Sequence, residues 1–313
     1  MMKAYNIIFM GTPGFAVPAL KAIHASNHHI SLVVTQPDRP KGRGRKIIPP
    51  PVKKTALDLG YPVLQPVSVK KKEFVEVVTR DKPDFLVVVA YGRILPKTIL
   101  QLPKLGTINL HASLLPKYRG PAPIQWAIIN GETVTGVTSM LMDEGLDTGD
   151  ILLAVEEKIS PADTSATLHD RLARLGANLL VDTLNRYSKG QIRPVQQDHS
   201  QASQAPLLKK SDGHIAWDAP AEKISGLIRG MTPWPGAFTF HEGKRFKIFN
   251  AKSVKADVSQ APGTVIKGFA DELRVATTKG FLSVLEIQGA SGKRLLIADF
   301  LRGYKMPPGT ILK

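Results

Sequence analysis

The chain has 313 residues, of which 43% are hydrophobic and 22% charged, and its net charge at pH 7 is +16. This composition is globular, excludes a disordered chain and provides for two domains. The absence of cysteine excludes disulfides and thiolate chemistry. No apolar run approaches the roughly 20 residues that span a bilayer, and no targeting segment is evident. We therefore expect a cytoplasmic protein without membrane contact.

Residues 1–190 alternate short apolar runs with segments of helical spacing. The apolar runs are rich in β-branched residues, as in strands buried on both faces of a parallel sheet; they lie at residues 5–11, 29–37, 84–92, 106–112 and 136–145. Helical spacing is found at residues 51–61, 70–81 and 163–190. This order predicts an α/β fold: a doubly wound, mostly parallel, Rossmann-like catalytic domain over residues 1–190.

The character of the chain changes after Gly190. Residues 191–208 are polar and predict a linker, whereas residues 209–313 contain several short strand-like segments and one helical segment at 221–231. The last segment predicts a small OB-like β-barrel domain. It holds 17 Lys/Arg against 9 Asp/Glu, about twice the positive charge density of the rest. A basic domain indicates a nucleic-acid partner, although a device for solubility is the alternative.

An amide and an imidazole interrupt the apolar run that ends at residue 112. If residues 107–111 form a strand, Ile108 and Leu110 face one side, and Asn109 and His111 face the other, about 7 Å apart. This pair then lies at the carboxyl end of a parallel sheet, where ligands bind. Taken alone, a histidine in such a run is more often a structural residue.

The second polar feature is an acidic, glycine-containing loop that follows the strand at 136–142. It carries Asp143, Glu144, Asp147 and Asp150, one of which could pair with His111; a solvated turn is the alternative. The chain has no cysteine nucleophile, no Gly-x-Ser-x-Gly motif, no Walker loop and no zinc-binding spacing. We therefore expect no metal. Asn, His and Asp without a nucleophile suit acyl transfer to an incoming amine.

A basic loop, "QPDRPKGRGRK", follows the second predicted strand. Its cations are candidates for phosphate contacts in a nucleic acid, with a merely solvated loop as the alternative; they are Arg39, Lys41, Arg43, Arg45 and Lys46. Two adjacent histidines upstream, His28 and His29, show no metal spacing, and we place both on the surface.

The stretch "NLHASLLPKYRG", with "MDEGLDTGDI" downstream, resembles the folate-dependent formyltransferases. The resemblance covers nearly the whole chain, and "FMGTPGFAVPAL", "VVTQPDRPKGRGRKI" and "IRGMTPWPGAF" resemble the branch of this family that acts on tRNA. It implies that Asn109, His111 and Asp147 are catalytic. It also implies a folate-contacting loop, made of Ser113, Leu114, Leu115 and Pro116.

The resemblance further implies a reaction in translation initiation. A formyl group would pass from 10-formyltetrahydrofolate to the α-amino group of initiator methionyl-tRNA, with the basic loop at the end of the acceptor stem and the C-terminal domain along the tRNA backbone. An α-amine has a pKa of about 7.7–8.0, so no strong base is required. Asn109 and His111 would stabilise the oxyanion, and Asp147 would relay the proton. We expect the enzyme to be a monomer.

Two other functions share parts of this pattern. A folate-dependent formyltransferase acting on a small amine, such as a sugar nucleotide or glycinamide ribonucleotide, would use the same chemistry without needing the basic loop. A non-catalytic nucleic-acid-binding protein would need no intact catalytic set. The roles of Lys117 and Arg119 stay open between the glutamate tail of folate and the tRNA end.

Overall fold

The computed structural model describes residues 3–41, 46–269, 271–290 and 292–313. The chain forms two compact units that interleave along the sequence. Unit 1 comprises Met1–Pro123, Val134–Lys158 and His169–Ala205. Unit 2 comprises Ile124–Thr133, Ile159–Leu168 and Pro206–Lys313. Two short pieces from the middle of the chain therefore fold with the C-terminal part.

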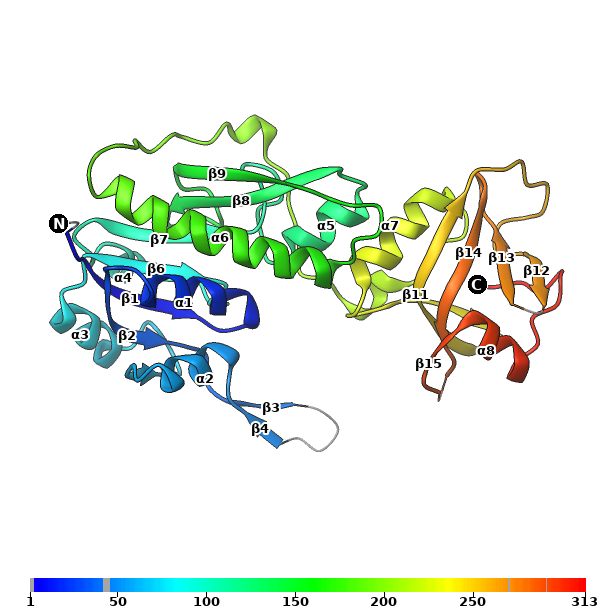
Figure 1. The fold of residues 1–313 in the computed structure, drawn as a ribbon, viewed down its shortest axis with the longest axis horizontal. Coiled ribbons are helices and arrows are strands. Elements are labelled where there is room, and N and C mark those ends of the chain that lie inside the picture. The colour runs from blue at the N-terminus through cyan, green and yellow to red at the C-terminus, as the bar shows by residue number, and fades with distance from the viewer. Residues whose placement is uncertain (1–2, 42–45, 270, 291) are drawn as a thin grey trace. The chain divides into compact units, whose positions relative to one another are not determined.

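Unit 1 is built on a seven-stranded sheet of order β5-β2-β1-β6-β7-β8-β9 (Figure 1). The pairs among the first five are parallel, and β8 and β9 extend the sheet in antiparallel fashion. The strands are β1 Asn6–Gly11, β2 His29–Val34, β5 Val63–Leu64, β6 Phe85–Val89, β7 Gly106–His111, β8 Val134–Leu141 and β9 Ile151–Lys158. The predicted doubly wound, mostly parallel sheet is confirmed.

Helices cover both faces of this sheet. Helix α6, Ser165–Tyr187, packs on one face, where Gly176 contacts Leu110 of β7. On the other face, Phe74 and Ile99 join the apolar cluster around Val88. The remaining helices of the α/β part are α1 Val17–His24, α2 Pro51–Asp58, α3 Lys72–Asp81 and α4 Lys97–Leu100. Because Val88 is paired with Asn109, the polar residues of β7 lie on the face of α3 and α4.

The basic segment after β2 forms a small hairpin. Strand β3, Arg39–Lys41, pairs in antiparallel fashion with β4, Lys46–Ile48. Arg39 is exposed. Two of the predicted phosphate contacts, Arg43 and Arg45, lie outside the described residues.

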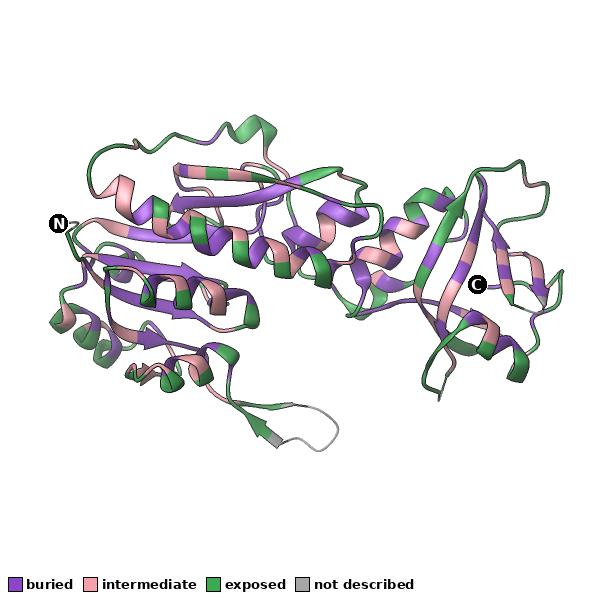
Figure 2. Cartoon of the chain, in the orientation of Figure 1, coloured by how far each residue is buried: buried purple, intermediate pink, exposed green. Residues whose placement is uncertain are grey.

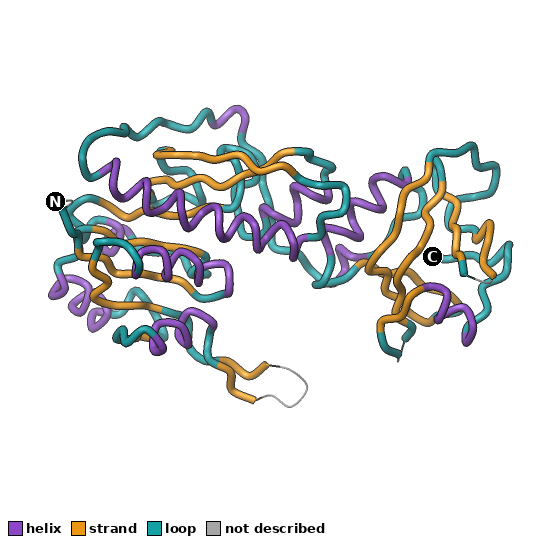
Figure 3. Tube along the Cα trace, in the orientation of Figure 1, coloured by secondary structure: helices purple, strands orange, loops and turns teal. Residues whose placement is uncertain are grey.

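Unit 2 contains a second sheet, which is antiparallel and has the order β10-β11-β14-β13-β12, with β15 beside β14 (Figure 3). A turn at Glu242 and Gly243 joins its first two strands. The strands are β10 Ala237–His241, β11 Lys244–Val254, β12 Val265–Phe269, β13 Glu272–Ala276, β14 Phe281–Gln288 and β15 Arg294–Leu296, with helices α5 Pro123–Ile129, α7 Ala221–Met231 and α8 Ile297–Gly303. The predicted helix at 221–231 is confirmed.

The C-terminal residues bring the two edges of this second sheet together. Lys313 exchanges backbone hydrogen bonds with Phe240 of β10, at 2.6 and 2.9 Å. Two residues earlier, Ile311 forms a β-bridge with Thr264, which directly precedes β12. The end of the chain therefore links the first and last strands of the sheet path, as in a small barrel.

Burial alternates along β9 at the edge of the first sheet and along much of β11 in unit 2, but not along the central strands of unit 1 (Figure 2). In unit 1, all residues of β6 are buried, as expected for a central strand with helices on both faces. One prediction about the surface is wrong: His28 is buried at 6% exposure, whereas its neighbour His29 is exposed. Burial lowers the pKa of His28, and neither of its ring nitrogens has a hydrogen-bond partner among the described residues.

Candidate active site

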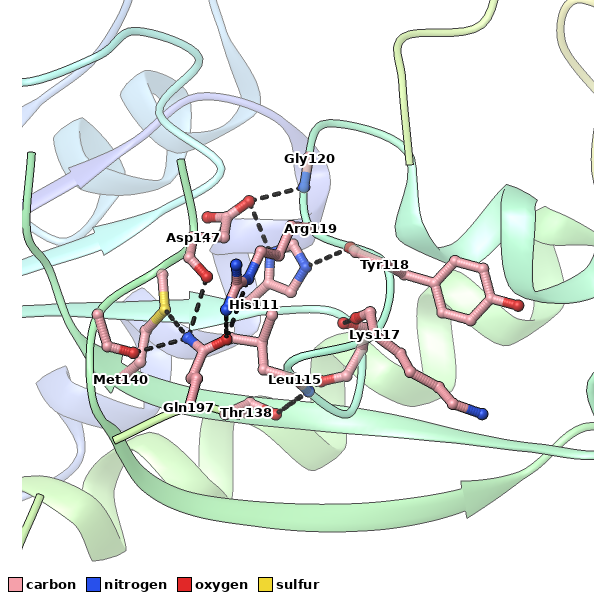
Figure 4. A network of polar contacts seen from close by, with 12 residues as sticks. His111, Leu115, Lys117, Tyr118, Arg119, Gly120, Thr138, Met140, Asp147 and Gln197 are labelled. Carbon is pink, nitrogen blue, oxygen red and sulfur yellow. Dashed lines mark hydrogen bonds and ion pairs between the residues drawn. The ribbon is translucent and has the colours of Figure 1, made fainter. Parts of the chain in front are cut away.

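The carboxyl end of β7 carries the two polar residues that the sequence singles out. Asn109 and His111 are buried, at 9% and 6% exposure, on the face opposite Ile108 and Leu110. Beyond His111 the chain turns through residues 112–122 and returns to the same end of the sheet (Figure 4). This return brings backbone groups of the loop against the imidazole ring.

Both ring nitrogens of His111 face a protein group (Figure 4). Nε2 lies 2.9 Å from the backbone carbonyl of Tyr118, and Nδ1 lies 3.7 Å from Oδ2 of Asp147. Because a carbonyl only accepts hydrogen bonds, Nε2 carries the proton of a neutral ring. A proton on Nδ1 then makes the ring cationic and faces the carboxylate. The same Oδ2 accepts a hydrogen bond of 2.8 Å from the backbone N–H of Gly120.

Asn109 differs from His111 in having an uncommitted side chain. Its amide makes no hydrogen bond to any residue that the structure describes. The amide is also absent from the fully buried side-chain groups without a partner in the described part of the chain, so it still reaches the space at the end of β7. Asn109 is therefore suited to donate a hydrogen bond to a ligand that enters at this end of the sheet.

The acidic loop between β8 and β9 presents one carboxylate to the imidazole. Asp143 accepts hydrogen bonds from the backbone of Gly145 and the hydroxyl of Thr148, and Glu144 forms an ion pair with Lys97 at 2.7 Å. Among the acids of this loop, Asp147 is the one paired with His111. Local hydrogen bonds thus shape the loop, while Asp147 is directed inward.

Two small residues allow the loops at this end to approach closely. A Cβ on Gly120, which has a φ of +123°, would lie 2.7 Å from the carbonyl oxygen of Ala205. A Cβ on Gly149 would lie 1.8 Å from the carbonyl oxygen of Leu141. No other residue fits either position without displacing backbone.

The predicted folate-contacting loop has two buried and two half-buried members. Ser113 is fully buried, and its hydroxyl donates to the carbonyl of Lys117 at 2.6 Å, while Leu115 is buried at 7% exposure. Leu114 and Pro116 are half-buried. The loop is fastened to β8, since Thr138 donates to the carbonyl of Ser113 at 2.7 Å. Leu114 and Pro116 therefore retain surface that a ligand can contact.

The two basic residues whose roles were open separate in the structure. Lys117 is exposed, whereas Arg119 is buried at 5% exposure. Arg119 donates to Oε1 of Gln197 through Nε and Nη2, at 3.1 and 2.6 Å, and its Nη2 lies 3.0 Å from Nδ1 of His199. Because its guanidinium is bonded to these two residues, Arg119 supports the fold around the site. Sequence reasoning missed Gln197, because it lies in a polar segment without periodicity.

A cavity of about 490 Å³ opens at the carboxyl ends of three parallel strands. Thr12, Gln36 and Ala90, which follow β1, β2 and β6, line it together with residues of the β3–β4 hairpin, Arg39 and Ile48 among them. Tyr91 also lines it, and burial raises the pKa of this phenol. The basic hairpin therefore forms part of the wall of a pocket large enough for a small ligand or a chain end.

In unit 2, the outer face of strands β10 and β11 combines aromatic rings with cations. Phe238 is paired with Lys247, and Phe240 with Arg245, so the four side chains share one face. The guanidinium of Arg245 lies 5.5 Å from the centre of the Phe238 ring. Phe238 is buried, so this face offers a nucleic acid its cations and the half-buried ring of Phe240.

The cations of this outer face are crowded. The pKa of Lys247 is lowered, first by burial and then by the positive charges of Arg245 and Lys210. On the same sheet, the guanidinium of Arg294 lies 4.7 Å from the centre of the Phe249 ring. Cations that repel one another in the free protein favour a polyanionic partner, which relieves the repulsion.

Within the described ranges, we find no group of three or more histidine and acidic side chains arranged to hold a metal ion. Across the same residues, no helix is both long and apolar enough to cross a bilayer. The polar groups at the end of β7 are an amide, an imidazole and a carboxylate, and this arrangement suits the movement of protons and the stabilisation of an oxyanion.

Comparison with known families agrees with this chemistry. The family model described as "Formyl transferase" matches residues 5–184, and that described as "Formyl transferase, C-terminal domain" matches residues 207–305. The chain therefore belongs to the formyl transferase family.

Two relatives match over nearly their whole length. The methionyl-tRNA formyltransferase of Desulfotalea psychrophila is 51% identical over 311 residues, which is 99% of this chain and 96% of the relative. That of Caldanaerobacter subterraneus subsp. tengcongensis is 50% identical over 309 residues, covering 98% of this chain and all (100%) of the relative.

Solved structures share the fold at much lower identity. HypX from Aquifex aeolicus in complex with tetrahydrofolic acid has a TM-score of 0.66 at 18% identity, over 97% of this chain and 49% of HypX. WlaRD, a sugar 3N-formyl transferase solved with dTDP and 5-N-formyl-THF, has a TM-score of 0.67 at 18% identity, over 93% of this chain and 100% of WlaRD. These likenesses support the architecture of the fold.

Proposed function

We propose that this enzyme transfers the formyl group of 10-formyltetrahydrofolate to the α-amino group of initiator methionyl-tRNA, acting as a monomer. Two full-length relatives at about half identity carry the name methionyl-tRNA formyltransferase, which supports the substrate. The structural observation that carries the chemistry is the group at the end of β7. There, His111 faces the carboxylate of Asp147, and the amide of Asn109 stands uncommitted beside them.

Asn109 and His111 can both donate hydrogen bonds to the oxygen of the formyl group that the folate supplies. Attack by the amine nitrogen on the formyl carbon places negative charge on the formyl oxygen. Asn109 donates a hydrogen bond to this oxygen through its uncommitted amide. Since Nε2 of His111 is held by the carbonyl of Tyr118, Nδ1 is the ring nitrogen that can serve as the second donor, and it does so in the cationic ring. Preorganised donors of this kind are the largest catalytic term in acyl transfer.

Proton movement completes the reaction. A bond forms between the amine nitrogen and the formyl carbon, the bond from that carbon to the folate nitrogen breaks, and the proton lost by the amine ends on the folate nitrogen. Asp147, whose carboxylate is 3.7 Å from His111, is the base that can accept and return this proton. An α-amine with a pKa of about 7.7–8.0 is partly neutral at pH 7, so a weak base suffices.

The remaining residue roles follow the same proposal. Ser113 and Leu115 shape the loop that faces the folate, and Leu114 and Pro116 contact it. The basic hairpin contacts tRNA phosphates through Arg39, Lys41, Arg43, Arg45 and Lys46, and the outer face of β10 and β11 adds cations. Functionally, we divide the chain into a catalytic domain at 1–190, a linker at 191–208 whose residues up to Ala205 pack with unit 1, and a tRNA-binding domain at 209–313.

One assay tests the proposal against its competitors. Formyl transfer from 10-formyltetrahydrofolate is measured with methionyl-tRNA, free methionine and an amino-sugar nucleotide as acceptors. We expect kcat/KM for methionyl-tRNA to exceed that for either small amine by more than 10²-fold, because the basic hairpin and the second unit act only on tRNA. Comparable values for the sugar nucleotide would favour the small-amine enzyme. No transfer to any acceptor would favour a non-catalytic binding protein.

A further inference from the structure

Residues 195–205, within the polar segment that follows α6, form a strap across the loops of the active site. Val195 forms an antiparallel bridge with Ile151, with backbone hydrogen bonds of 2.8 and 2.9 Å. Near the other end, the backbone N–H groups of Arg119 and Ala205 donate to the carbonyls of Ser203 and Arg119, at 2.8 and 2.7 Å. The strap therefore joins the acidic loop, which precedes Ile151, to the loop that follows His111.

Gln197 is the side chain of the strap that contacts both loops (Figure 4). It is buried at 3% exposure. Its Nε2 donates to the backbone carbonyls of Asp147 and Gly149, at 3.0 and 2.6 Å. Its Oε1 accepts two hydrogen bonds from Arg119, the residue before Gly120. The amide is thus fully used, with its nitrogen on the acidic loop and its oxygen on the loop of His111.

The backbone that Gln197 holds is in a conformation that needs support. Asp147 has a φ of +54°, in the left-handed region, which is uncommon for residues other than glycine, although aspartate tolerates it better than most. Such a conformation persists where surrounding contacts determine it. Two contacts act on opposite sides of this residue: Gln197 on its backbone carbonyl, and the N–H of Gly120 on its carboxylate.

We propose that Gln197 is a positioning residue for catalysis: its amide, anchored by Arg119, fixes the backbone of Asp147 and so holds the carboxylate against His111. This inference rests on the proposed role of Asp147. It gives the buried Arg119 a function distinct from ligand binding, as the anchor of the Gln197 oxygen. A catalytic group misplaced by about 1 Å can lower the rate by about 10²-fold. We therefore expect the loss of the Gln197 amide to lower kcat rather than to raise KM.

One substitution can separate the two functions of the Gln197 amide, which are donation to the acidic loop and acceptance from Arg119. Gln197→Glu keeps the size of the side chain and an oxygen for Arg119, but places an oxygen where the N–H groups faced two carbonyls. If the donation to the acidic loop matters, Gln197→Glu is as defective as Gln197→Met. If Gln197 serves only to satisfy Arg119, Gln197→Glu behaves as the native enzyme. Gln201→Met is the matched control, since the Gln201 amide bonds to Asp198 on the same strap.

The experiment measures kcat and both KM values of these variants, with their melting temperatures, in the full-length protein. We expect Gln197→Glu and Gln197→Met to lower kcat by about 10-fold to 10²-fold, with both KM values within about twofold and Gln201→Met unchanged. Should Gln197→Met fail to fold, Gln197→Glu carries the test. Native kcat in Gln197→Glu overturns the inference.

A double-mutant cycle separates positioning from a structural effect. When Asp147→Asn has removed the carboxylate, adding Gln197→Glu should lower kcat by less than twofold, because no catalytic group remains to be positioned. Losses that multiply in the double variant would mean that Gln197 acts on the site as a whole, and would overturn the inference. A native kcat in Asp147→Asn alone would instead contradict the proposed catalytic role of Asp147.

Discussion

The end of β7 and the basic surfaces differ in how firmly their polar side chains are held and in how exposed they are. Around His111 the polar groups are buried or half-buried, and each of Gln197, Arg119 and Asp147 is held by partners at hydrogen-bond distances of 2.6–3.1 Å. By contrast, Arg39 on the hairpin and Arg245 on β11 are exposed cations. Electrostatic catalysis needs groups fixed in advance, whereas attraction to a polyanion needs charge density and tolerates movement. Substitutions should therefore affect kcat in the first region and tRNA affinity in the second.

The largest effects are expected at the end of β7. His111→Ala and Asn109→Ala should each lower kcat by about 10²-fold or more, because each removes a donor to the oxyanion. The measurement is single-turnover formylation of methionyl-tRNA with both substrates saturating. His24→Ala is the matched control, since His24 is exposed and its ring contacts Tyr61. Near-native turnover of His111→Ala would contradict its assignment and remove the contrast between the two regions.

A smaller effect, of a different kind, is expected on the basic surfaces. Arg39→Ala and Arg245→Ala should each weaken tRNA binding while leaving kcat and the KM for folate within about twofold. Each lost phosphate contact should also reduce the slope of log KM for tRNA against log salt by about 0.7–0.9. Arg80→Ala, which removes an exposed arginine from α3, is the control and should leave the slope unchanged. An equal salt dependence of the KM for folate would contradict the separation of roles.

The sequence predicts a feature of these regions well when that feature depends on neighbouring residues alone. Strand alternation correctly placed Asn109 and His111 on one face of β7, because a period of two is a property of the backbone. The partner acid was less accessible: four carboxylates lie within eight positions, and only the family resemblance pointed to Asp147. Strand β9 was not anticipated, because its alternating exposed residues follow a glycine-rich loop without a clear start.

The support of the site was beyond sequence reasoning for a physical reason. The polar composition of residues 191–208 predicts a linker, yet residues up to Ala205 belong to unit 1 and hold its loops. Gln197 and Arg119 meet across 78 positions through hydrogen bonds. Such contacts have no periodicity, since they depend on the fold of segments that are far apart in the chain.

The smallest expected effect is on the pH dependence of stability and comes from His28. This second buried histidine lacks the ring partners that His111 has. His28 is buried without a partner for either ring nitrogen among the described residues, and burial lowers its pKa from 6.5. As pH falls below about 6.5, the unfolded chain binds the proton more readily than the folded one, so the free energy of unfolding decreases. This loss is absent above that pH, where both states are neutral. It amounts to at most about 1 kcal/mol between pH 6.5 and 5.5.

Replacement of His28 should remove that part of the acid sensitivity. His28→Phe keeps a ring beside Tyr5, whose centre is 5.7 Å away, and eliminates both the titration and the two nitrogens without partners. Urea unfolding at pH 7.0 and 5.5 should show a smaller difference in the free energy of unfolding for His28→Phe than for the native protein. The exposed His29 provides the control, since His29→Asn removes an imidazole from the surface. An unchanged difference in His28→Phe would mean that the buried ring is protonated as readily in the folded state as in the unfolded chain.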